Sequence, residues 1–342
     1  MKFINIRTAL AAIPMQVSST GLVIEGDAPL QRLLGFLDAV LRGIGQVMLQ
    51  NNSYTGLVFL FGIFYNSLLF GWAALFGTIL STATAVLLGA NRFDVRAGLF
   101  GFNGALVAIA LLYFLEPSIL TWSYVALAAA CTSIIMAALL NLLKVWKMPT
   151  LTAPFVFTTL FFVMACARLG RLHTTGVLPT AGLPKAATVE GIVTSLTVVE
   201  GIFNGVAQVF FQGNVITGVL FIVGLLIGSR LACISAFLGS LIGLLVAWGM
   251  GAAEPAIHSG AFGFNAALTA IALGSVFFVP NIASMVYGLF AVITTTVMFA
   301  AMSAALEPFG MPALTSPFVL VVWLFVLASP IFPRLQAVTG EL

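Results

Sequence analysis

Long apolar stretches alternate with short polar breaks along most of this chain, and the alternation predicts helices that cross a membrane. In the first part we expect helices at residues 55–70, 71–90, 99–115 and 118–145 and one ending at 167. In the second part we expect them at residues 217–229, 231–250, 258–273 and 281–304 and one ending at 329. Such stretches suit helices of roughly 20 residues and lack the short alternation of a membrane β-barrel.

Two further segments, residues 30–50 and 189–212, have a helical pattern but carry charge. The first contains Asp38, and the second has Glu200 at the matching place. Charge makes each a poor lipid-facing span. Each is therefore expected to be either amphipathic and packed inside the protein or tilted and re-entrant.

The chain repeats itself at long range, which predicts two related halves rather than a solenoid of short repeats. Three motif pairs recur at a spacing of 162 or 163 residues: LFGFNGAL (99–106) with AFGFNAAL (261–268), Gln46-Val47 with Gln208-Val209, and LTAPFV (151–156) with LTSPFV (314–319). Five spans and one short pore helix in each half would insert the halves with opposite orientation. The expected fold is an all-α integral membrane protein of two inverted-topology repeats, with the pore at their interface.

Breaks in composition give the expected domain boundaries. The expected segments are an N-terminal arm (1–29), a first membrane repeat (30–167), a polar linker rich in Gly and Pro (168–187), a second membrane repeat (188–331) and a C-terminal tail (332–342). Linker residues of this kind interrupt regular structure. Lys2, Arg7, Arg32 and Arg334 favour cytoplasmic ends, whereas the linker cations Arg168, Arg171 and Lys185 argue the other way. We predict cytoplasmic ends.

Composition confirms the class and excludes several functions. The chain is 61% hydrophobic and 7% charged, with a mean hydropathy of +1.16, against about 25% charged in soluble proteins. It contains no HExxH, serine elbow or phosphate loop. We therefore expect no enzyme, cofactor or metal site, and no nucleic-acid partner. The scarcity of intramembrane carboxylates favours a neutral solute.

The repeated residues suggest a narrow slot. Each half supplies an amide near a helix end, aromatics in a glycine-rich break, an asparagine and a threonine before a proline: Gln46, Phe100, Phe102, Asn103 and Thr152, and Gln208, Phe262, Phe264, Asn265 and Thr315. Irregular backbone at membrane depth persists where it is buried or lines a cavity. Flat apolar walls with acceptors along one edge suit a planar, neutral molecule rich in N–H groups, and exclude ions.

Plainer interpretations remain for the same residues. A glutamine can simply bond between helices, and phenylalanines beside glycines can serve packing. Thr152 and Thr315 can bond backbone groups freed by the following prolines. Asp38 and Glu200 can cap backbone N–H groups or pair with neighbouring charges.

The motifs above resemble those of the urea transporter (urea channel) family, in its bacterial-type, single-unit form. The resemblance runs from about residue 42 to residue 327, and its strongest blocks include RGIGQVMLQNNSYTGLVFLFGI, GLFGFNGALVAIAL and GAFGFNAALTAIALG. It implies a homotrimer with one pore in each subunit, five membrane helices and one short pore helix per half, and no coupling ion. It also implies passive, channel-like transport of urea across a cell membrane (the inner membrane if the source is bacterial), with small amide analogues as candidate further solutes.

The resemblance also implies roles for twelve positions of this chain. Gln46 and Gln208 would be the hydrogen-bonding residues of two opposed sites, although the family can have an acidic residue at the position of Gln208. The implied slot walls are Val47, Leu49, Phe102, Leu106, Val209, Phe211, Phe264 and Leu268. Thr152 and Thr315 would supply hydroxyls at the constriction.

Two other functions stay open at this stage. An ion-coupled secondary transporter of a small neutral solute would use Asp38 and Glu200, and a membrane scaffold would transport nothing. Which segment is re-entrant, the one before Gln46 or the one before Phe102, also stays open.

Overall fold

The computed structural model describes residues 15–24, 28–184 and 188–338. A short hairpin of β1 (Met15–Ser18) and β2 (Gly21–Ile24) precedes the helices. The helices before the linker are α2 (Pro29–Gln46), α3 (Ser53–Asn66), α4 (Leu68–Leu87), α5 (Arg92–Arg96), α6 (Phe102–Phe114), α7 (Ile119–Lys144) and α8 (Ala153–Cys166). Those after it are α9 (Ser195–Ala207), α10 (Val215–Gly228), α11 (Arg230–Gly249), α12 (Glu254–His258), α13 (Gly263–Ile271), α14 (Ile282–Leu306) and α15 (Ser316–Ala328).

Short 3₁₀ and π segments extend four of these helices. They are η1 (Gln208–Phe210), η2 (Ala272–Val276), η3 (Glu307–Phe309) and η4 (Ser329–Ile331). The predicted helices therefore exist, although α6, α8 and α15 are shorter than the roughly 20 residues expected of a span. The predicted division between residues 70 and 71 was wrong by about one turn, because Ser67 is extended and its hydroxyl accepts a hydrogen bond from Phe70 N.

Within the described residues, five helical segments are long and apolar enough to cross a membrane. They are α4, α7, α11, the run Glu254–Val276 and α14 with its 3₁₀ end. The pair α9–η1 and α10 bends by 73° at its break and makes a sixth if it counts as one span. Large apolar side chains on their outer faces are exposed, for example Phe290 on α14. This is an all-helical membrane protein apart from the small hairpin.

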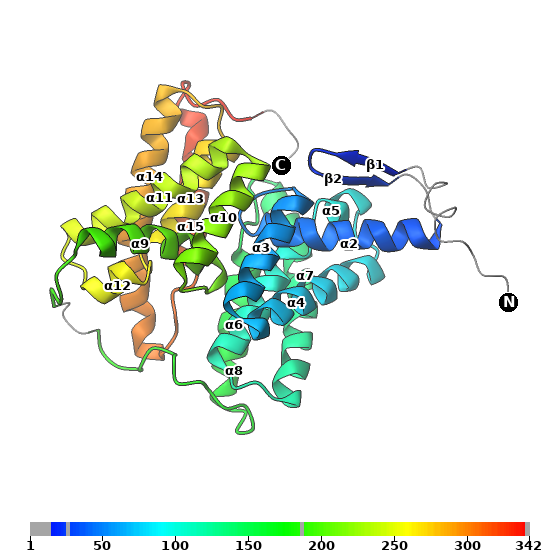
Figure 1. Ribbon diagram of the computed structural model, residues 1–342, viewed down its shortest axis with the longest axis horizontal. Helices are drawn as coiled ribbons and strands as arrows, with labels where there is room; N and C mark the ends of the chain where they lie inside the picture. Colours follow the sequence, from blue (N-terminus) through cyan, green and yellow to red (C-terminus); the bar gives the residue numbers. More distant parts are fainter. Residues whose placement is uncertain (1–14, 25–27, 185–187, 339–342) are drawn as a thin grey trace.

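The two pieces of chain before and after the linker meet at the centre of the molecule. Figure 1 shows α2 and α9 running toward this centre from opposite sides, with α3 and α10 between them. Thr55 Oγ1 on α3 donates to Gly224 O on α10 at 2.9 Å, and Thr217 Oγ1 on α10 donates to Gly62 O on α3 at 3.2 Å. The rings of Phe59 and Phe221 pack edge-on beside these bonds. Each side thus supplies matching contacts to the other.

Glycines allow close backbone approaches between the helices. Gly98 has φ +78°, and a Cβ on it would overlap the backbone nitrogen of Gly43. Gly260 has φ +77° and would meet Gly205 in the same way. A larger residue at either place would both strain the turn and separate the helices.

The hairpin was not predicted, and it explains one charged residue. Asp38 on α2 is buried and accepts hydrogen bonds from Leu22 N at 3.0 Å and from Arg42 Nε at 2.6 Å. Ser53 N, at the start of α3, donates to Thr20 O at 3.0 Å. Asp38 therefore caps the hairpin backbone and pairs with a cation, which is the structural role considered for it.

Candidate functional site

Gln46 and Gln208 end the two helices that run to the centre of the molecule. Gln46 Nε2 donates to Ala97 O at 2.9 Å, and Gln208 Nε2 donates to Ser259 O at 3.2 Å. Both side chains are partly buried, and no described residue donates a hydrogen bond to either Oε1 atom. Each amide is thus fixed through its nitrogen, while its oxygen remains an acceptor for another molecule.

A tight turn follows each glutamine and redirects the chain. Leu49 and Phe211 both have φ +60°, in the left-handed region that non-glycine residues rarely adopt. Strained residues of this kind persist when their surroundings hold them firmly. Gln50 Nε2 donates to Met48 O at 3.1 Å and Gln212 Nε2 to Phe210 O at 2.6 Å, so a second glutamine braces each turn. The sequence did not predict this role for the second glutamine, although amide residues are unusually frequent just after Gln46.

The repeated asparagines hold the site together rather than facing a solute. Asn103 Nδ2 donates to Leu151 O at 3.4 Å, and Asn103 Oδ1 accepts from Phe155 N at 3.1 Å. Asn265 makes the matching pair with Leu314 O and Phe318 N at 3.1 and 3.2 Å. Both asparagines are 1% exposed. Their amides therefore position the broken backbone that precedes α8 and α15.

The two repeated threonines touch each other. Thr152 and Thr315 precede α8 and α15, and their Oγ1 atoms are 2.6 Å apart. Both are nearly fully buried, at 2% and 3% exposure. They do not bond to backbone groups freed by the neighbouring prolines, which was the plainer interpretation. The hydroxyl pair instead joins the two parts of the chain at the centre.

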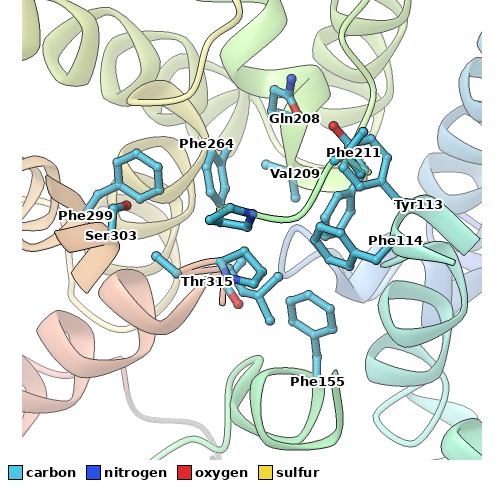
Figure 2. A pocket seen from close by; sticks show the side chains of 15 residues that line it. Tyr113, Phe114, Phe155, Gln208, Val209, Phe211, Phe264, Phe299, Ser303 and Thr315 are labelled. Carbon is cyan, nitrogen blue, oxygen red and sulfur yellow. The ribbon is translucent and has the colours of Figure 1, made fainter. Parts of the chain in front are cut away.

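A cavity of about 280 Å³ opens beside this threonine pair. Figure 2 shows Gln208 at one end of it and Thr315 toward the other. The structure brings together here five of the residues singled out from the sequence: Gln208, Val209, Phe211, Phe264 and Thr315. The lining residues that the sequence did not indicate are Tyr113, Phe114, Phe155, Val177, Pro179, Phe299, Ser303, Pro312, Ala313 and Leu314. Val177 and Pro179 come from the linker, so it also contributes to the site.

Aromatic rings form two walls of the cavity. In Figure 2, Phe264 and Phe299 face Phe211 and Tyr113 across it. Phe264 and Phe299 pack edge to face at 5.5 Å, and Tyr113 lies 5.4 Å from Phe211 between ring centroids. Such packing holds rings in place, so the space between the walls is preformed.

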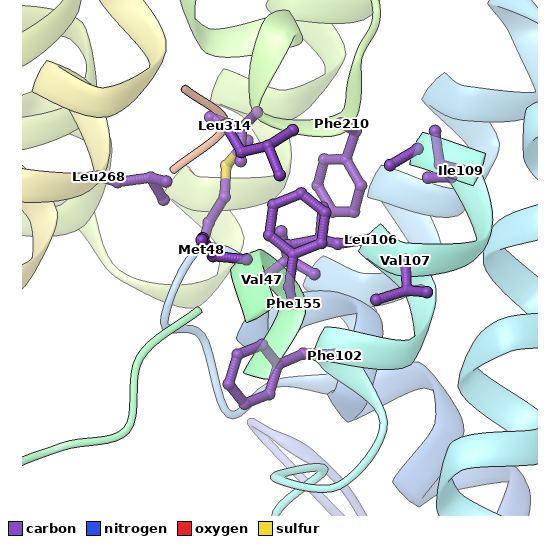
Figure 3. Close-up of a cluster of buried hydrophobic side chains, with 14 of the residues drawn as sticks. Val47, Met48, Phe102, Leu106, Val107, Ile109, Phe155, Phe210, Leu268 and Leu314 are labelled. Carbon is purple, nitrogen blue, oxygen red and sulfur yellow. The ribbon is translucent and has the colours of Figure 1, made fainter. Parts of the chain in front are cut away.

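The other predicted wall residues lie elsewhere. Val47, Phe102, Leu106 and Leu268 are buried within the main hydrophobic cluster, to which Phe155 and Phe210 also belong (Figure 3). The side chains absent from the lining of the described cavity are Gln46, Val47, Leu49, Phe102, Leu106, Thr152 and Leu268. A hydrogen-bond contact joins Thr152, which is outside the lining, to Thr315, which is part of it.

The cavity has polar groups but no charged lining residue. Glu200 pairs with His258 at 2.6 Å, and Asp38 with Arg42, and none of the four lines the cavity. The described residues hold no group of His, Cys, Asp or Glu suited to a metal ion. An ion entering this cavity would lose hydration without a counter-charge, whereas a neutral molecule would find an amide oxygen and hydroxyls.

Comparison with known proteins places these features in one family. The sequence model of that family, described as Urea transporter, matches residues 37–330. The chain is 30% identical over 310 residues to Urea transporter 1 of sheep (Ovis aries) and of goat (Capra hircus), covering 88% of this chain and 79% of each relative. Urea transporter 1 of rat (Rattus norvegicus) is 29% identical over 308 residues, covering 89% and 79%.

Proposed function

This chain belongs to the urea transporter family, and from that membership we propose that it carries urea passively across a membrane along the path through the aromatic cavity and the threonine pair. It is a multi-pass membrane protein and not an enzyme. The observation that carries the proposal is the uncharged cavity with a free glutamine oxygen at one end and the Thr152–Thr315 contact beside it.

The proposed roles follow from hydrogen-bonding capacity. Urea is planar and neutral and carries four N–H donors. Its faces would lie between the walls of Phe211 and Phe264, and its N–H groups would donate to Gln208 Oε1 and then to the hydroxyls of Thr315 and Thr152. Because each N–H group of urea moves directly from one acceptor to the next, the free-energy cost of removing its water at each step stays small.

The remaining predicted residues belong to a second, opposed site in this proposal. Gln46 would supply its amide oxygen there, because its nitrogen is held by Ala97 O just as that of Gln208 is held by Ser259 O. The expected walls are Val47, Leu49, Phe102, Leu106 and Leu268. Four of them are buried in the main hydrophobic cluster and Leu49 packs against it, which implies that side-chain movement opens this part of the path.

We propose the inverted repeat as the basis of this arrangement, with α2 and α9 as the two re-entrant pore helices. Support comes from the linker. Glu116 N, just after α6, donates a hydrogen bond to His173 O of the linker. Gly182 N of the linker donates to Glu307 O, just after α14. The ends of α6 and α14 therefore lie on one side. In the first half, α7 corresponds to α14. The end of α7 lies one membrane crossing away from the end of α6, so it falls on the opposite side from the end of α14, as an inverted repeat requires.

Charge then favours one orientation in the membrane. The ends of α4 and α7 fall on the side opposite the linker and carry Arg92, Arg96, Lys144 and Lys147. The side of the linker has Arg168 and Arg171 together with several glutamates. By the positive-inside tendency, we propose that the side carrying Arg92 and Arg96 faces the cytoplasm.

We also propose a homotrimer with a separate pore in each subunit and a bacterial-type, single-unit architecture. Both rest on the resemblance to the family that the repeated motifs carry. Light scattering of the purified protein during size-exclusion chromatography measures the first. A mass of about one subunit would exclude it.

The test of function is a urea jump on proteoliposomes without any ion gradient, followed by light scattering. Fast re-swelling that follows the urea gradient, beyond that of protein-free vesicles, is the expected result. Flux that appears only after a Na⁺ or H⁺ gradient is applied, and is lost in Asp38→Asn, would instead identify an ion-coupled transporter. The pairing of Asp38 with Arg42, away from the cavity, argues against that alternative.

A further inference from the structure

A second cavity, of about 660 Å³, is separate from the aromatic cavity of the proposed urea path. It is formed by the start of α2, the end of α4 and α5. Its lining includes three arginines, Arg32, Arg92 and Arg96, together with Gln31 and Asn91. None of its lining residues lines the urea cavity. The aromatic cavity therefore does not explain this concentration of positive charge.

The arginines are accessible from outside the protein. All three are exposed, and Arg32 and Arg92 also interact within the chain, which restricts their side chains. Arg96 makes no side-chain hydrogen bond or ion pair with another described residue. Asp94 lies on the same short helix but does not line the cavity. Guanidinium groups arranged in this way suit a planar or tetrahedral oxyanion.

Exposed apolar side chains stand next to the residues that line this cavity. Leu87, Leu88 and Phe93 border it in the sequence and are 84%, 69% and 81% exposed. They follow the apolar span α4, so they lie where a membrane helix reaches the lipid headgroups. A cationic cavity beside exposed apolar side chains matches a molecule with an anionic head and hydrocarbon tails.

The three arginines are not repeated at the matching positions of the second half. The positions that match Arg32, Arg92 and Arg96 after the linker are Thr194, Glu254 and His258. There Glu254 accepts a hydrogen bond from Thr197, and His258 pairs with Glu200. One end of the molecule is therefore basic where its counterpart contains a carboxylate.

We propose that this cavity binds the phosphate of an anionic phospholipid, with the acyl chains along the exposed side chains of Leu87, Leu88 and Phe93. The inference rests on the chain being a membrane protein and not on the identity of its solute. Each arginine near an anionic headgroup strengthens binding by a factor of about five. The lipid would thereby anchor the junction of α2, α4 and α5 to the leaflet on this side.

Native mass spectrometry of the purified full chain in detergent tests the proposal, with phosphatidylglycerol and phosphatidylcholine titrated separately. We expect the first phosphatidylglycerol to bind at least tenfold more tightly than phosphatidylcholine. Arg96→Gln should weaken phosphatidylglycerol binding about fivefold, and Arg32→Gln/Arg92→Gln/Arg96→Gln by about a hundredfold. The matched control is Lys144→Gln/Lys147→Gln, which removes charge on the same side outside the cavity and should change binding less than twofold.

Three outcomes would overturn the proposal. Equal binding of the two lipids would mean that the cavity does not select a charge. Equal loss in the Lys144/Lys147 control would mean a diffuse effect of surface charge. Full competition by millimolar inorganic phosphate would mean a site for a free anion rather than a lipid. If the triple variant does not fold, Arg96→Gln alone decides, because Arg96 has no described intramolecular partner to lose.

Discussion

The contact between Thr152 and Thr315 gives the sharpest prediction for transport. Replacing both with valine removes two hydroxyls at nearly constant volume. Their Oγ1 atoms are 2.6 Å apart and both residues are buried, so either single change leaves the other hydroxyl without its partner. A single variant should lose about 1–3 kcal/mol of stability, and the double variant should be no less stable than the worse single variant.

The effect on urea flux follows from counting hydrogen bonds. A passing urea must break the threonine–threonine bond and can then donate to both oxygens. In Thr152→Val/Thr315→Val two such bonds are lost, while one bond no longer needs to be broken. At about 1 kcal/mol net for each bond, the barrier rises by about 1 kcal/mol. Flux through correctly assembled protein should therefore fall about fivefold.

Stopped-flow light scattering of proteoliposomes measures the flux, normalised to protein recovered in the membrane. The matched control is Thr158→Val, a buried threonine on the same helix α8 whose hydroxyl donates to Pro154 O at 2.7 Å. Thr158→Val should keep the flux of the unmodified chain within twofold. Unchanged or increased flux in the double variant would refute the assignment of these hydroxyls to the constriction.

Three further changes test the site and its frame. Gln208→Leu removes the acceptor at the end of the cavity and should lower urea flux about five- to tenfold in the same assay; unchanged flux would exclude its proposed role. Asn103→Ala leaves Leu151 O and Phe155 N without their amide partner, so thermal unfolding should show a loss of about 2–4 kcal/mol, and a loss under 1 kcal/mol would contradict its bracing role. Gly56→Ala places a Cβ on the carbonyl oxygen of Leu41 and should abolish monodisperse protein in size-exclusion chromatography, whereas Gly35→Ala, with open space around it, should not.

Helix positions and the residues at the centre were predictable because they depend on local pattern. The apolar runs gave nearly all the helices, since a membrane helix needs about 20 apolar residues whatever its neighbours are. The repeat at 162 or 163 residues identified Gln208, Phe264 and Thr315, and the structure places all three around one cavity. The glycines at 98 and 260 marked close approaches because the turn and the contact both exclude a side chain.

Other features depend on contacts between distant segments, so only the tertiary structure decides them. Tyr113 and Phe299 line the cavity because α6 and α14 converge there, and no local pattern separates them from other buried aromatics. The sequence pattern suggested that Asn103 faces the solute. In the structure, Asn103 and Asn265 instead donate hydrogen bonds to the carbonyl oxygens of Leu151 and Leu314, where the backbone is irregular. The hydroxyls of Thr152 and Thr315 lie 163 positions apart in the sequence, and only the meeting of the two parts of the chain brings them into contact. Residue type and spacing thus determine which groups are available, while packing decides which of them remain free for a solute.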